Sequence, residues 1–93
     1  MSRVIYKYAL PGAPNEYGAF VVEMPQAAKP LHVNVQNGQR VVWAEVYPGN
    51  TPRQHKIIVV GTGKEPPIAK RYLNTFFEGP FVWHVYDGGE QPA

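Results

Sequence analysis

Four consecutive residues, Gly61-Thr62-Gly63-Lys64, have the composition of a small loop that could bind an anion. Successive backbone N–H groups in a glycine turn can form a concave anion site, and a neighbouring lysine adds positive charge. The phosphate-binding P-loop motif is not matched, because it needs Gly where Ile58 stands and Ser or Thr where Glu65 stands. Two interpretations stay open: an anion-binding loop, and a plain turn that requires positive φ values.

The next cations and aromatic rings along the chain could complete such a site. Lys70, Arg71 and Tyr72 follow within nine residues counted from Lys64, and one ring, a backbone turn and a cation or two are enough to hold a nucleotide. We expect Lys64 and the glycine amides to bind phosphate, Arg71 to add charge, and Tyr72 or Trp83 to stack on a base. The predicted ligand-binding residues are Gly61, Thr62, Gly63, Lys64, Arg71, Tyr72, Trp83 and His84.

Nucleophilic and acid–base catalysis find little support in the residues available. The single Ser, Ser2, and the single Asp, Asp87, stand near opposite ends of the chain, and there is no Cys. A Ser-His-Asp triad would therefore need residues from both ends of the chain. The glutamates have no spacing that selects a catalytic pair. We expect no enzymatic activity and no catalytic residues.

Metal binding is not indicated either. His32, His55 and His84 fall on three different predicted strands, and no two of them have the short spacing typical of zinc ligands. We expect no metal and no other cofactor.

Length and charge narrow the class of partner. The 93 residues carry nine Lys and Arg against seven Asp and Glu, and the positive residues are scattered. Nucleic-acid modules usually have a denser basic stripe, so we expect no nucleic acid partner. No apolar run is long enough for a signal peptide or a membrane span, and the lack of Cys fits a reducing cytoplasm. We expect one domain, residues 1–93.

The elements that must position these residues have the pattern of short β-strands. Apolar alternation and β-branched runs, interrupted by Pro and Gly, predict an all-β protein: a small antiparallel β-sandwich or partly open barrel of about seven short strands. Asn37-Gly38 predicts a type I′ hairpin turn, Ala27 and Ala28 allow one helical turn, and residues 87–93 have the composition of a loose tail. The expected strands are Val4–Leu10, Ala19–Met24, Leu31–Gln36, Arg40–Tyr47, Arg53–Val60, Tyr72–Phe77 and Phe81–Tyr86.

Three of these strands, Arg40–Tyr47, Gln54–Val60 and Phe81–Tyr86, are apolar on both faces. In the last one, Trp83 and its alternate neighbours fill one face, and His84 lies among apolar residues on the other. A strand that is apolar on both faces is usually buried on both. This pattern fits either a crowded centre with some aromatic surface or a homo-oligomer that covers the second face. We expect the homo-oligomer.

Several segments along the whole chain resemble a family of small uncharacterised proteins of bacteriophages and prophages, a domain of unknown function. The most specific are Trp43-Ala44, Val60–Gly63 and Gly79–His84. The chain departs from that family in having Lys64–Pro67 after the glycines, where a His-Pro pair is more usual. The other matching segments are Val4–Tyr8, Met24-Pro25, Leu31 and Val33–Gly38.

The resemblance implies a phage accessory protein in the cytoplasm of an infected bacterial host. Such proteins often sequester host molecules, nucleotide-type immune signals among them, or block host proteins, and others decorate the virion. Together with the glycine loop, this leads us to expect a non-enzymatic anti-defence protein that sequesters a small anionic, nucleotide-like ligand. The alternative is a protein–protein interaction module, either an inhibitor of a host defence protein or a virion decoration protein.

Overall fold

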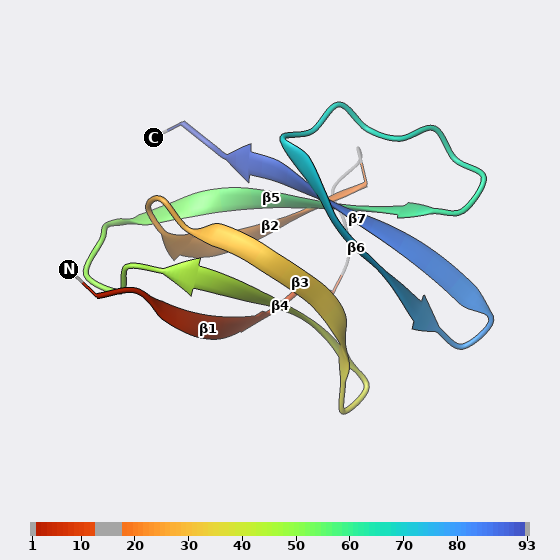
Figure 1. Ribbon diagram of the computed structural model, residues 1–93, viewed down its shortest axis with the longest axis horizontal. Coiled ribbons are helices and arrows are strands. Elements are labelled where there is room, and N and C mark those ends of the chain that lie inside the picture. Colours follow the sequence, from red (N-terminus) through yellow and green to blue (C-terminus); the bar gives the residue numbers. More distant parts are fainter. Residues whose placement is uncertain (1, 13–17, 93) are drawn as a thin grey trace.

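The computed structural model describes residues 2–12 and 18–92, and the strands in these ranges form two packed antiparallel sheets (Figure 1). No helix occurs in the described ranges, so none could cross a membrane there. The predicted all-β class is confirmed, as a small sandwich rather than a closed barrel. The strands are β1 (Val4–Ala9), β2 (Ala19–Pro25), β3 (Lys29–Gln36), β4 (Gln39–Val46), β5 (Pro52–Gly61), β6 (Arg71–Glu78) and β7 (Phe81–Glu90).

One sheet has the strand order β1-β4-β3 and the other has the order β2-β5-β7-β6. The β3–β4 hairpin turns at Asn37 and Gly38, whose φ angles of 52° and 77° confirm the predicted type I′ turn. Ala27, where one helical turn was allowed, instead has a φ of 69° in a tight turn closed by the Ala28 N–H and the Pro25 carbonyl. The predicted break after Leu10 extends into residues 13–15, which lie outside the described ranges.

The core lies between the sheets and consists of alternate residues from the facing strands. Every second residue of a strand points to the same face, and these inward positions carry the apolar side chains. Val33, Val42 and Ile57 are fully buried at its centre. The remaining buried core residues are Leu10, Phe20, Val22, Met24, Ala44, Val46, Phe76 and Val85.

Side chains of β6 join the two sheets along the edge of β3. The Asn74 side chain accepts a hydrogen bond from the Val33 N–H at 2.9 Å and donates one to the Val33 carbonyl at 2.8 Å. Arg71 donates to the Pro30 carbonyl on the same edge. The edge of β3 is therefore satisfied by side chains instead of a further strand, which also protects it from pairing with another chain.

The last strand continues past the point where a loose tail was expected. β7 runs to Glu90, and Asp87 is only 4% exposed, with its buried carboxylate accepting hydrogen bonds from His55 and from the Gly89 N–H. The glycines that indicated fraying serve a bulge opposite Lys56. A Cβ on Gly88 would lie 2.9 Å from the Cβ of Lys56, so only glycine fits there without a shift.

The loop between β5 and β6 leaves the end of β5 and curves back to the start of β6 (Figure 1). Its end is fixed by a hydrogen bond of 2.8 Å from the Lys70 N–H to the Asp87 carbonyl, and its Pro66 lines the same cavity as Val60 and Tyr86 on the outer face of the sheet. The second apolar face of β5 and β7 is thus partly covered by the chain's own loop. The predicted homo-oligomer stays a prediction.

Candidate functional site

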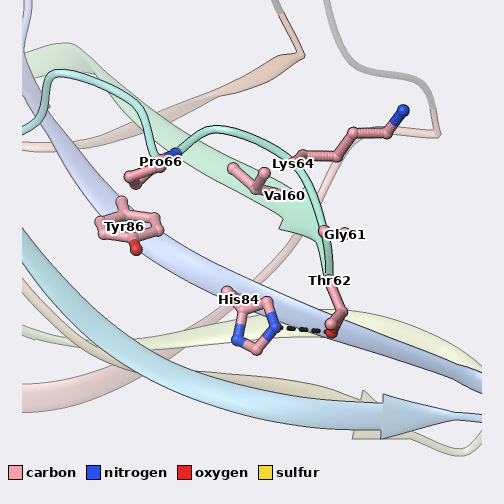
Figure 2. A pocket seen from close by; sticks show the side chains of 8 residues that line it. Val60, Gly61, Thr62, Lys64, Pro66, His84 and Tyr86 are labelled. Carbon is pink, nitrogen blue, oxygen red and sulfur yellow. Dashed lines mark hydrogen bonds between the residues drawn. The ribbon is translucent and has the colours of Figure 1, made fainter.

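A cavity of about 270 Å³ opens where β5 passes into this loop (Figure 2). One wall is the loop itself, and the floor is the outer face of β5 and β7. Five predicted site residues line this cavity: Gly61, Thr62, Gly63, Lys64 and His84. The glycine loop singled out in the sequence therefore lines a concave part of the surface. Its other lining residues are Val60, Pro66 and Tyr86.

The glycine turn has its own hydrogen bonds. The Lys64 N–H donates to the Gly61 carbonyl at 3.2 Å, and the Thr62 N–H donates to the Val82 carbonyl at 3.4 Å. Gly63 has a φ of 91°, which a glycine adopts without steric cost. Because the amides of Thr62 and Lys64 are already used, the expected row of free N–H groups along this turn is interrupted on both sides of Gly63.

His84 is held in place on the floor of the cavity by two hydroxyl groups. Its Nε2 lies 2.8 Å from the Thr62 Oγ1, and its Nδ1 lies 2.8 Å from the Thr75 Oγ1. The Thr75 hydroxyl is in turn hydrogen-bonded to the Tyr72 hydroxyl. Since hydroxyls can donate or accept, this chain fixes the ring plane of His84 without selecting one tautomer.

Two tyrosines extend this polar floor with aromatic surface. The rings of Tyr72 and Tyr86 meet edge to face with their centroids 5.5 Å apart. Tyr86 lines the cavity and Tyr72, which is 51% exposed, stands beside it. A ligand ring could therefore stack on Tyr86, a residue not included in the predicted site although strand alternation places it on the same face as His84.

Lys64 supplies a cation at the rim. Figure 2 shows its side chain extending away from His84 and Tyr86. Its ammonium makes no hydrogen bond or ion pair with any residue in the described ranges. A lysine stem is long and flexible, so its ammonium could turn toward a ligand that enters the cavity.

Two predicted site residues point elsewhere. Arg71 faces the space between the sheets, where it binds the Pro30 carbonyl and lies 3.9 Å from the Asp87 carboxylate. Trp83 is on the opposite face of β7 from His84, and its Nε1–H donates to Glu78 at 3.2 Å. Their proximity to the loop in sequence was misleading because alternation along a strand separates neighbouring side chains by the thickness of the sheet.

The three histidines do not come together. His32 packs against Trp43 on the three-stranded sheet, His55 is buried beside Asp87 in the core, and His84 lies on the outer face of the four-stranded sheet. Within residues 2–12 and 18–92, no group of three or more His, Asp or Glu side chains could hold a metal ion.

These features define a small β-sandwich protein with a loop-bounded cavity that combines a histidine, a tyrosine ring and a lysine at the rim. The chain belongs to the family described as Domain of unknown function (DUF7352), which matches residues 1–93. This confirms the part of the resemblance that concerns a family of unknown function. The sequence matches no curated protein and no solved structure.

Proposed function

We propose that this protein binds a small anionic ligand, a nucleotide-type molecule, in the cavity between the β5–β6 loop and the outer face of β7. The observation that carries the proposal is a single cavity lined by Thr62, His84 and Tyr86, with Lys64 at its rim. Aromatic surface, a polar floor and a cation at the rim are the groups that a base, a sugar and a phosphate require.

Each group has a stated role. The ring of Tyr86 stacks on the base, the hydroxyl of Thr62, which His84 positions, meets the sugar or phosphate oxygens, and Lys64 turns over the cavity to neutralise the phosphate. Sites for drug-sized ligands usually measure about 300–1,000 Å³, and this cavity is about 270 Å³. That size favours a single nucleotide over a dinucleotide.

Binding without turnover is the activity that the lining residues support. Among the residues that line the cavity there is no carboxylate, and both ring nitrogens of His84 already have hydroxyl partners. In the phage setting that the sequence resemblance implies, the protein would sequester a nucleotide-type immune signal in the cytoplasm of an infected host.

Calorimetric titration with AMP, cyclic AMP and inorganic phosphate tests the proposal. We expect Lys64→Ala and Tyr86→Ala each to weaken nucleotide binding by about tenfold or more, since charged hydrogen bonds and base stacking each contribute about 1–3 kcal/mol. Lys29→Ala, an exposed lysine on β3 in the other sheet, is the charge-matched control and should bind as wild type does. Absence of nucleotide binding by the wild type up to millimolar concentration would overturn the proposal.

A second candidate function, a protein–protein interaction module, is favoured by the hairpin of β6 and β7. Phe77 and Phe81 flank its turn and are 73% and 57% exposed, on opposite faces of the sheet. Exposed aromatic residues often anchor protein partners. Here Phe77→Ser with Phe81→Ser should abolish capture of a specific host protein while leaving nucleotide binding intact, and retention of that protein by the double variant would exclude the hairpin.

A further inference from the structure

The first strand leaves one long edge open. β1 pairs with β4 along its whole length, and no other described strand pairs with its second edge, which lies at the lower rim of the molecule in Figure 1. Three of its apolar side chains are exposed: Ile5 at 63%, Tyr6 at 46% and Val4 at 38%. An exposed apolar edge strand is a ready template for pairing with another chain.

The open edge has defined hydrogen-bonding positions. The Leu10 N–H donates to the Arg40 carbonyl at 2.9 Å, in continuation of the β1–β4 register. Opposed residues in an antiparallel pair of strands alternate between pairs that are hydrogen-bonded to each other and pairs that are not. Because Leu10 is hydrogen-bonded to β4, the even-numbered residues of β1 are hydrogen-bonded to β4 as well. The N–H and C=O groups of Ile5, Lys7 and Ala9 therefore point outward from the edge.

We infer that β1 pairs antiparallel with β1 of a second copy of this chain, joining two three-stranded sheets into one of six strands. In two symmetric registers, the outward-pointing residues of one β1 lie opposite outward-pointing residues of the partner's β1 and can hydrogen-bond to them. In each of these registers, five residues of one β1 overlap with five residues of the other. One sets Lys7 opposite the partner's Lys7, and like charges directly opposite each other are destabilising. The other is centred on Tyr6 and sets Ile5 opposite the partner's Lys7.

The Tyr6-centred register is the one that the charges select. It places no like charges opposite each other, and it pairs Val4 with the partner's Tyr8 on the face that looks toward the four-stranded sheet. The symmetry axis is perpendicular to the joined sheet, so both four-stranded sheets stay on the same side of it. The exposed apolar side chains of β1 gain cross-strand neighbours, and its free backbone groups are satisfied. This dimer does not depend on the proposed ligand.

Single-cysteine variants test both the contact and its register, because the chain has no Cys of its own. Residues opposite each other at a non-bonded position lie about 4.5 Å apart between Cα atoms, within the range for a disulfide. Tyr6→Cys should therefore form a covalent dimer under mild oxidation. Val4→Cys is the control on the same face, since the two copies of residue 4 would lie four residues apart along the strand, about 13 Å.

Light scattering after size exclusion measures the association itself. The wild type should elute as a dimer, and Ile5→Pro should elute as a folded monomer, because the N–H it removes points away from β4 and proline is tolerated at a sheet edge. A monomeric wild type at about 100 μM, a condition that allows even micromolar association, would overturn the inference. So would a dimer in which Tyr6→Cys fails to cross-link.

Discussion

Arg40 on β4 and Glu78 on β6 form a two-bond ion pair that connects the two sheets. The Arg40 Nη2 lies 2.7 Å from one carboxylate oxygen of Glu78, and its Nε lies 3.1 Å from the other. The guanidinium also lies within 6 Å of three aromatic ring centroids, those of Phe20, Phe76 and Trp83. A rigid two-bond pair enclosed by rings fixes the relative position of the sheets at this end of the sandwich.

Removing this pair should weaken the fold measurably. We expect Arg40→Ala to lower the free energy of unfolding by about 2–3 kcal/mol, because Glu78 loses both hydrogen bonds and the rings lose their cation. Arg3→Ala is the matched control: Arg3 also pairs with a glutamate, Glu45, but its side chain is 60% exposed, and exposed pairs contribute at most about 1 kcal/mol. Urea unfolding measures the free energy of unfolding of both variants. Equal losses would contradict the role of Arg40 in connecting the two sheets.

Acid should destabilise the protein through the same pair. The hydrogen bond from Arg40 lowers the pKa of Glu78 below its ordinary value of 4.5, with the charge of Arg40 and the bond from Trp83 acting in the same direction and partial burial opposing them. Since the folded pKa is the lower one, ionised Glu78 stabilises the fold above the ordinary value, and this contribution is lost as the pH falls below it. Glu78→Gln should therefore flatten the fall in stability between about pH 5 and pH 3. The urea midpoints of wild type and Glu78→Gln, measured across this pH range, test this prediction. An equally steep fall of the midpoint with pH in both proteins would count against it.

Asn74 should contribute more to stability than an ordinary strand asparagine. Its amide satisfies both backbone groups of Val33, which is fully buried. Asn74→Ala should cost about 2–3 kcal/mol, because buried backbone groups without partners carry a desolvation penalty. Asn34→Ala, which removes only a bond to the N–H of the next residue on an exposed face, should cost less than about 0.5 kcal/mol. Hydrogen exchange at Val33 should also accelerate in the first variant alone, and unchanged exchange there would refute the role assigned to Asn74.

The strands were predictable because their signals are local. Alternation in Leu31–Gln36, the β-branched run Ile57–Val60 and the Asn37-Gly38 turn depend only on residues near in sequence. The division into two sheets was not predictable from these signals, since it depends on non-local pairing such as β2 with β5. The continuation of β7 beyond Tyr86 was missed because two glycines indicate fraying unless the close approach of Lys56 on the facing strand, which leaves no room for a Cβ at Gly88, is known.

The structure brings the loop residues of the predicted site together with His84 and places Arg71 and Trp83 away from them. The turn from Gly61 to Lys64 has a positive φ at Gly63 and lines the cavity, as a glycine turn after a strand suggests. The position of Arg71 was not predictable, because its side chain is held away from the cavity by the Pro30 carbonyl and by Asp87, which are distant in sequence. Pro66 had no sequence signal, since its contact with the outer face depends on where the loop folds back.

Asp87 should prove essential to the fold, although its position seven residues from the end of the chain suggested a loose tail. Burial alone would raise the pKa of Asp87, but the hydrogen bonds from His55 and Gly89 and the charges of His55 and Arg71 lower it below 3.8. The carboxylate is therefore ionised, buried and paired. Asp87→Ala should cost about 3 kcal/mol, because removing one member of a buried pair leaves the other without compensation.

Two truncations separate this role of Asp87 from a general effect of the tail. Ending the chain after Tyr86 removes the partners of Ile57 and Lys56 in β7 and should leave a protein without a cooperative thermal transition. Ending it after Gln91, whose N–H still bonds to the Gln54 carbonyl, should change the melting temperature by no more than a few degrees. A well-folded protein ending at Tyr86 would show that the strand from Asp87 to Glu90 does not support the core.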